Sequence, residues 1–163
     1  MLKRGLSLIF VLAILFSITS CGDEVESPML SHKEFRLPLP EGYEVVENSD
    51  FDVTVSNGRY MIAVRRISFI AGMLQDAIPE TLTDVEFGEL YLKNCHRYEE
   101  VKKTTVAYAE YFDSSNGVEH YYVETFHRSP YAYFALLFVS YAEHAGEAES
   151  VFLELANKVY FTT

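Results

Sequence analysis

Residues 131–141 restrict the fold of this chain more than any other segment, because nearly all of them are apolar. A strand with one face in water alternates apolar and polar residues, so a continuous apolar run predicts a strand that is covered on both faces. The turn Ser129-Pro130 directly before it is short, which makes the strand predicted over 118–127 its antiparallel neighbour. We therefore expect a sheet built around this central strand, with helices packed on its faces.

Other elements follow from hydrophobic spacing and turn residues. Asn57-Gly58 predicts a two-residue hairpin between strands at 51–56 and 59–67. Thr83 and Glu86 form a capping box at the start of a helix predicted over 83–98. The apolar residues of that helix recur every three or four positions and are Phe87, Leu90, Tyr91, Cys95 and Tyr98.

The remaining segments complete an α+β chain. Residues 34–39, 43–47 and 104–112 are strand-like, the turn at 114–117 precedes the strand at 118–127, and an amphipathic helix over 146–160 closes the sequence. The prediction is an antiparallel sheet of about six strands with helices on its faces.

The first twenty residues have the layout of a secretory signal peptide. Lys3 and Arg4 precede an apolar run, and small polar residues follow at 17–20. The apolar stretch 6–18 is too short for a transmembrane helix, which needs about 20 residues. We therefore expect residues 1–20 to be a cleaved targeting segment.

Ile18-Thr19-Ser20-Cys21 resembles the lipobox of bacterial lipoproteins, in which an aliphatic and two small residues precede a cysteine. The resemblance implies cleavage before Cys21, which would carry a diacylglycerol and an N-acyl chain such as palmitate. We expect no other cofactor. The alternative is cleavage elsewhere, with Cys21 a free thiol.

The lipobox implies a lipid-anchored location in the bacterial cell envelope. Gly22 rather than Asp after the cysteine is compatible with the outer membrane, and the face of that membrane stays open. The partners expected are the membrane, through the lipid, and an envelope protein or peptide.

Acidic residues predominate after the signal peptide. The chain has 24 Asp and Glu against 13 Lys and Arg, a formal charge of −11. Nucleic-acid affinity depends on clustered cations, so this balance argues against a nucleic-acid partner. Residues 21–33 mix acids with Gly, Pro and Ser and predict a flexible tether. Residues 34–163 contain no second linker and are expected to form a single domain.

The segment FRLPLPEGY at residues 35–43, with the middle helix, the long hairpin at 121–141 and the closing helix, resembles the PsbP-like fold. This family, named for an extrinsic photosystem II subunit, also includes small bacterial lipoproteins. The resemblance implies an αβα sandwich that serves as a binding or assembly scaffold more often than as an enzyme.

Residues with catalytic potential are few. The sequence has no HExxH motif, no pair of closely spaced cysteines, no phosphate loop and no nucleophile elbow. His120 and Glu124 share one face of a predicted strand, where they would serve a metal or acid–base site or else form a solvated or hydrogen-bonded surface. Cys95 is expected to be a buried small hydrophobe rather than a reactive thiol.

Tyrosine and phenylalanine are abundant, with 12 of each and no tryptophan. Alternation places Tyr131, Tyr133 and Tyr141 on one face of the central strand, where they would line a groove for a peptide, glycan or protein or pack beneath a helix. Together with His120 and Glu124 they are the candidate ligand face, and no residue is assigned a catalytic, cofactor-binding or metal-binding role.

Three functions are consistent with these features. The first is a lipid-anchored envelope protein that acts as a non-catalytic binding or assembly accessory. The second is an envelope hydrolase or metal-dependent enzyme that uses His120 and Glu124. The third is a purely structural envelope lipoprotein.

Overall fold

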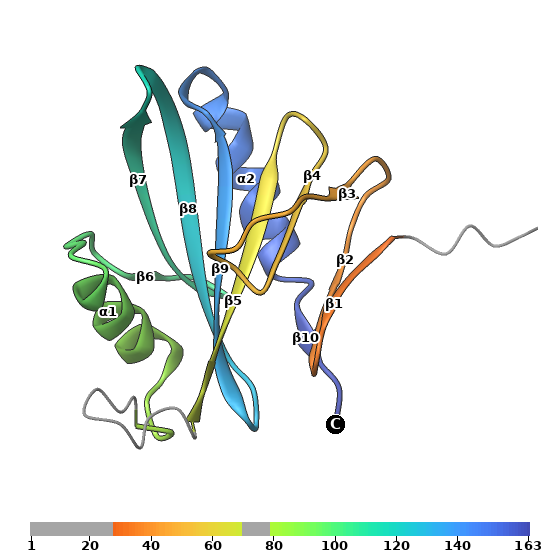
Figure 1. Ribbon diagram of the computed structural model, residues 1–163. Helices are drawn as coiled ribbons and strands as arrows, with labels where there is room; N and C mark the ends of the chain where they lie inside the picture. The colour runs from red at the N-terminus through yellow and green to blue at the C-terminus, as the bar shows by residue number, and fades with distance from the viewer. Residues whose placement is uncertain (1–27, 70–78) are drawn as a thin grey trace, which may run out of the picture.

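The computed structural model describes residues 28–69 and 79–163, which form two antiparallel sheets and two α-helices (Figure 1). The larger sheet has the strand order β3–β4–β5–β9–β8–β7–β6. Its strands are β3 (Glu44–Val45), β4 (Val53–Ser56), β5 (Met61–Ser68), β6 (Lys102–Lys103), β7 (Ala107–Ser115), β8 (Val118–Arg128) and β9 (Ala132–Tyr141). The smaller sheet consists of β1 (Met29–His32), β2 (Phe35–Pro38) and β10 (Tyr160–Phe161). The predicted α+β class is confirmed.

The predicted central strand is β9, which pairs with β5 on one side and β8 on the other. Its side chains alternate between the two faces of the sheet. Phe134 and Phe138 are fully buried on one face and Tyr133 on the other, which explains the continuous apolar run.

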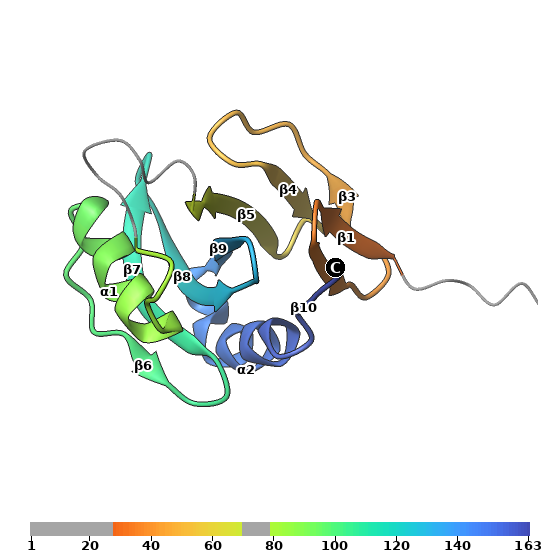
Figure 2. The same ribbon diagram turned by 90° about the horizontal axis from the view of Figure 1, so that it is seen from below.

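The two faces of the large sheet are covered differently. Helix α2 (Ala145–Ala156), which follows a short 3-10 turn η2 (Ala142–His144), packs on one face together with the small sheet. Helix α1 (Asp84–Asn94) packs on the opposite face, against β7, β8 and β9 (Figure 2). No helix within the described residues is long and apolar enough to cross a membrane.

The described part of the chain contains ten strands rather than about six, because several short strands lack a sequence signal. The hairpin at Asn57 also differs from the prediction. Ser56 pairs with Met61, so the loop has four residues, and the Asn57 side chain accepts hydrogen bonds from the backbone N–H of Arg59 and Tyr60. The register moves by two residues, which keeps every side chain on its expected face.

Helix α1 begins as predicted but ends four residues early. The capping box between Thr83 and Glu86 is present. At the other end, His96 has a φ of 58°, its N–H donates to the Lys93 carbonyl, and the Arg97 N–H donates to the Leu92 carbonyl. This is a Schellman motif, which stops the helix.

The early stop corrects the prediction for Cys95. Cys95 lies at the helix cap and is exposed rather than buried, and Tyr98, beyond the helix, is 83% exposed. Partial desolvation and the nearby Glu124 raise the pKa of the Cys95 thiol, although Arg65 and Arg97 oppose this. A raised pKa keeps the thiol protonated, which agrees with the expected lack of reactivity.

The predicted tether at 21–33 is also corrected where it overlaps β1. Met29–His32 pairs with β2, and Leu30 is 4% exposed in the core. Composition did not predict this strand, because a short edge strand needs only one buried apolar side chain and so shows no hydrophobic pattern. The predicted signal peptide, Cys21 and residues 22–27 of the predicted tether lie outside the described residues.

Gly88 is expected to be required for the close approach of α1 to the sheet. A Cβ atom at this position would lie 2.5 Å from the Phe126 ring. We expect Gly88→Ala to lower the free energy of unfolding by about 1–3 kcal/mol despite the better helix propensity of alanine. Gly146 in α2 has open space around it, so Gly146→Ala should instead stabilise the protein by about 0.5–1 kcal/mol. Urea unfolding of both variants tests this, and equal effects would contradict it.

Candidate functional site

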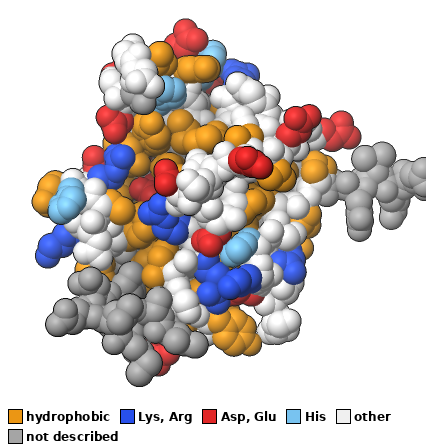
Figure 3. Space-filling view, viewed as in Figure 1, with side chains coloured by type: hydrophobic (Ala, Val, Ile, Leu, Met, Phe, Trp, Pro, Cys, Tyr) orange, Lys and Arg blue, Asp and Glu red, His pale blue; other side chains and the backbone are white. Residues whose placement is uncertain are grey.

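Among residues 28–69 and 79–163, no helix covers one part of the large sheet. Helix α1 covers the end of its face that carries Phe126 and Tyr133, whereas the end beside the β7–β8 hairpin is not covered by α1. Figure 3 shows hydrophobic side chains gathered in a hollow on this face. This open face is the candidate site.

A row of rings crosses the open face from β7 to β9. Tyr111 and Tyr122 stack with ring centroids 5.0 Å apart, His120 lies 6.2 Å from Tyr122, and His120 stacks on Tyr141 at 5.5 Å. The guanidinium of Arg97 lies over the Tyr111 ring at 4.1 Å. Such offset contacts stabilise one another by about 0.5–1.5 kcal/mol each, so the row is held in place before any ligand binds.

A cavity of about 310 Å³ lies between this row and the β4–β5 hairpin. Tyr141, which is 48% exposed, forms part of its wall. The lining residues are Ser56, Gly58, Arg59, Tyr60, Met61, His120, Tyr122, Val139, Ser140 and Tyr141. The volume is at the lower end of the range for small-ligand sites, about 300–1,000 Å³.

Glu124 lies further along β8 on the same face and is only 5% exposed. The Tyr111 hydroxyl donates to its Oε2 at 3.4 Å. Arg65, on β5, donates to the Tyr91 hydroxyl at 3.2 Å rather than to Glu124. Burial raises the pKa of the Glu124 carboxyl to about 7, although the Arg97 guanidinium and the hydrogen bond from Tyr111 act in the opposite direction. Of the two alternatives for this face, solvated or hydrogen-bonded, Glu124 has the hydrogen-bonded one, and it is buried.

The buried Glu124 is expected to make stability fall as pH rises. The pKa of Glu124 is raised in the folded protein, so the protonated carboxyl stabilises the fold. This contribution is fully present below the unfolded pKa near 4.5 and is lost as the pH rises through the folded pKa of about 7. We expect Glu124→Gln to exceed the wild type at pH 8 by on the order of 3 kcal/mol of unfolding free energy, and to match it near pH 4. Chemical denaturation at both pH values measures this.

Glu110 provides the opposite control. Hydrogen bonds from Lys102 and Tyr121 hold the pKa of the Glu110 carboxyl below its usual value, so Glu110→Gln should destabilise the protein at pH 8. The same sign for both variants would contradict the role assigned to the burial of Glu124.

The structure separates the residues of the predicted ligand face. His120 and Tyr141 lie together at the cavity. Tyr133 is fully buried beneath α1, stacked on Phe87 at 4.4 Å. Tyr131 lies in the β8–β9 turn and is 54% exposed.

His120 and Glu124 share a face, as predicted, but are four residues apart on one strand. At about 3.3 Å per residue they are separated by about 13 Å, with Tyr122 between them on the same face. This spacing is too large for one metal ion or one proton-transfer site. Within residues 28–69 and 79–163, no group of three or more His, Cys, Asp or Glu is placed to hold a metal ion.

Sequence analysis missed Tyr111, Tyr122 and Arg97. A signal for the first two existed in the turn Asn116-Gly117, whose residues both have positive φ, 54° and 80°. A two-residue turn there sets the register Ser115↔Val118, and the same register places Tyr111 opposite Tyr122. Arg97 follows α1, whose end was predicted four residues too late, so no turn or register in the sequence indicated its position.

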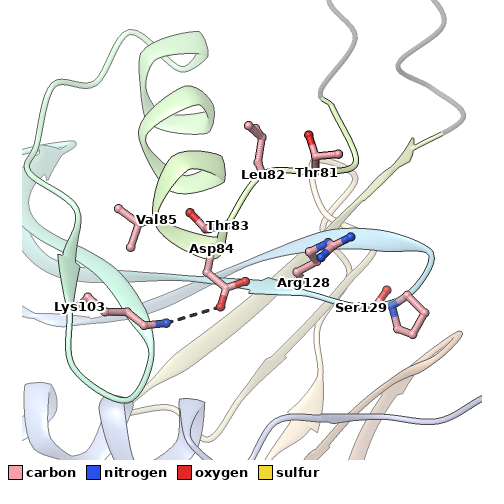
Figure 4. Close-up of a pocket in the computed structure, with 9 residues that line it drawn as sticks. Thr81, Leu82, Thr83, Asp84, Val85, Lys103, Arg128 and Ser129 are labelled. Atoms are coloured by element: carbon pink, nitrogen blue, oxygen red, sulfur yellow. Dashed lines mark ion pairs between the residues drawn. The ribbon is translucent and has the colours of Figure 1, made fainter.

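A second hollow, of about 850 Å³, lies at the first turn of α1 (Figure 4). Lys103 and Asp84 point toward each other across it, with nitrogen and oxygen 3.6 Å apart. The backbone N–H groups of Thr83 and Glu86 are already bonded within the capping box. These polar groups are satisfied by one another, so the cavity beside Tyr141 is the stronger candidate.

Comparison with known proteins gives structural likeness only, since no family model and no curated protein matches the chain. The fold is similar to a crystal structure from Bacteroides thetaiotaomicron VPI-5482, with a TM-score of 0.55 and 11% identity over 85% of this chain. The chain spans 49% of that protein's length. This likeness shows the fold alone.

Two further solved structures are similar. The solution structure of cyanobacterial PsbP (CyanoP) from Synechocystis sp. PCC 6803 has a TM-score of 0.49 and 10% identity, covering 89% of this chain and 99% of that one. LpqN, involved in cell envelope biogenesis of Mycobacterium tuberculosis, has a TM-score of 0.48 and 12% identity, covering 83% and 90%.

Proposed function

We propose that this protein is a lipid-anchored accessory of the bacterial cell envelope that binds a ligand on its open sheet face without catalysing a reaction. The observation that carries the proposal is the cavity beside Tyr141, lined by an ordered row of rings. The distance of about 13 Å between His120 and Glu124 favours binding over catalysis by that pair.

Lipid attachment at Cys21 is the second part of the proposal and rests on the lipobox. With β1 beginning at Met29, seven residues, 22–28, separate Cys21 from the first strand. A flexible chain of that length reaches about 15 Å, so the anchor would hold the β1 side of the domain near the lipid surface. In both ribbon views β1 and α1 lie on opposite sides of the molecule (Figures 1 and 2).

Each part has its own experiment. Mass spectrometry of the mature N-terminal peptide should find Cys21 carrying acyl chains, and Cys21→Ala should release the protein from the membrane fraction. An unmodified residue 21 in membrane-bound protein would overturn the anchor.

The binding face is tested in cells that lack the protein. We expect deletion to cause an envelope defect and a Tyr131→Ala copy to relieve it, because Tyr131 lies outside the cavity. A Tyr141→Ala copy should fail. Full restoration by Tyr141→Ala would overturn the proposed role of the open face.

A further inference from the structure

We infer that the cavity beside Tyr141 binds one sugar unit of a neutral glycan. The inference rests on the proposed function and specifies its ligand. Four features of the cavity support it: its charge, its unpartnered polar atoms, its apolar wall and the hydrogen-bonding state of the strands below it.

The charge of the lining favours a neutral ligand. Arg59 carries the one permanent charge among the lining residues, and its Nη2 lies 2.5 Å from the Glu147 carboxylate on α2. That pair leaves no net charge for an ionic group. The formal charge of −11 on the chain further disfavours an anionic ligand.

The polar atoms of the cavity suit hydroxyl groups. Within the described residues, two buried polar atoms of the lining have no hydrogen-bond partner, the Tyr60 hydroxyl and His120 Nδ1. A buried polar atom in a native protein normally has a partner. A ligand hydroxyl both donates and accepts, so it can satisfy a phenol and either tautomer of the imidazole.

The apolar part of the cavity suits the C–H face of a sugar ring. Tyr141 is half exposed and is backed on one side by His120 at 5.5 Å. Val139, 7% exposed, forms part of the apolar lining. A volume of about 310 Å³ accommodates a small ring system rather than a long segment.

The sheet below the cavity disfavours an extended peptide. Strands β5, β9 and β8 are each paired on both sides, so none presents free backbone groups to a peptide as an edge strand does. A peptide laid across this face would gain no backbone hydrogen bonds from the sheet. A glycan has no such backbone, and its hydroxyls meet side chains.

The test is saturation-transfer NMR and calorimetry on the full-length protein in a detergent without a sugar headgroup. The probes are cellohexaose, maltohexaose and chitohexaose, with oligogalacturonate as the anionic counterpart. We expect at least one neutral probe to bind and the anionic probe to fail. Tyr141→Ala should weaken that binding about tenfold, the loss of one aromatic contact.

Tyr131→Ala is the matched control, since Tyr131 is similarly exposed, at 54%, but lies outside the cavity. It should bind as the wild type does. Tyr141→Phe keeps the ring and removes the hydroxyl, so it should lose less affinity than Tyr141→Ala. It is the variant to use if Tyr141→Ala proves unstable.

Two results would overturn the inference. The first is the absence of binding by every neutral probe, and the second is binding that Tyr141→Ala leaves unchanged. Either result leaves the lipid anchor and the cellular role of the open face to their own experiments, so failure of the glycan assignment is distinguishable from failure of the proposed function.

Discussion

Glu34→Ala is expected to lower the free energy of unfolding by about 3–5 kcal/mol, because it leaves a buried guanidinium without its partner. Arg66 donates from Nε and Nη2 to the Glu34 carboxylate at 3.1–3.2 Å, and Ser129 Oγ donates to Oε1 at 3.1 Å. The side chains of Arg66 and Glu34 are 15% and 8% exposed. The pair links the β1–β2 turn to β5 and to the β8–β9 turn, and so joins the two sheets.

The acid dependence of this pair has a definite sign. Burial alone would raise the pKa of Glu34, but the hydrogen bonds from Arg66 and Ser129 outweigh it and hold the pKa below its usual value. Its stabilising effect is therefore present above the unfolded pKa and is lost as pH falls through the folded one. Denaturant unfolding between pH 7 and pH 3 should show a smaller acid-induced loss in Glu34→Ala than in the wild type.

An exposed ion pair is the control. Lys158 donates to Glu154 at 2.7 Å on the surface of α2 and the residues after it, and Glu154→Ala should change stability by no more than about 0.5 kcal/mol. If Glu34→Ala lowered the free energy of unfolding by as little as Glu154→Ala does, the stabilising role assigned to the buried pair would be refuted.

Tyr133→Ala is the second large effect, with an expected loss of about 3–5 kcal/mol. Tyr133 is fully buried, stacks on Phe87 at 4.4 Å and contacts the Phe69 ring edge-on at 5.1 Å. Its removal would leave a cavity between α1 and β9. Thermal and urea unfolding measure the loss.

Tyr133→Phe separates the hydroxyl from the ring. The hydroxyl donates to the carbonyls of Pro79 and Leu82 at 2.9 and 3.0 Å, so its removal should cost about 1–3 kcal/mol. Glycan binding should not change in Tyr133→Phe. A change in binding with normal stability would return Tyr133 to the ligand face.

The elements best predicted from sequence were those with a local cause. The Thr83–Glu86 capping box, the central strand and the start of the closing helix all depend on residues close together in the chain. The closing helix ends at Ala156 rather than at 160, and Tyr160 lies in β10. The end of α1 was missed because His96 adopts a positive φ, a conformation that sequence favours for glycine or asparagine. Strand β1 was missed because its one buried residue, Leu30, is buried only after the small sheet forms.

The candidate site was predicted in part. His120 and Tyr141 were identified as ligand-face residues, and they meet at the cavity because β8 and β9 pair with His120 opposite Tyr141. The alternation of side chains along a strand could not separate Tyr141 from Tyr133, because both lie on the same face of the same strand. Their difference depends on how far α1 extends over that face, and this is a property of packing.

Sequence alone therefore determined the α+β class, the buried central strand and the acidic charge, each from neighbouring residues or composition. It also supplied the resemblance of residues 18–21 to a lipobox, on which the proposed anchor rests. The tertiary structure alone decided that α1 covers Tyr133 and leaves Tyr141 open, and that Glu124 is buried beside Tyr111. The physical reason is that hydrophobic periodicity and secondary-structure propensity depend on residues close together in the chain. Burial depends on which part of the sheet each helix covers, and that is set by tertiary packing.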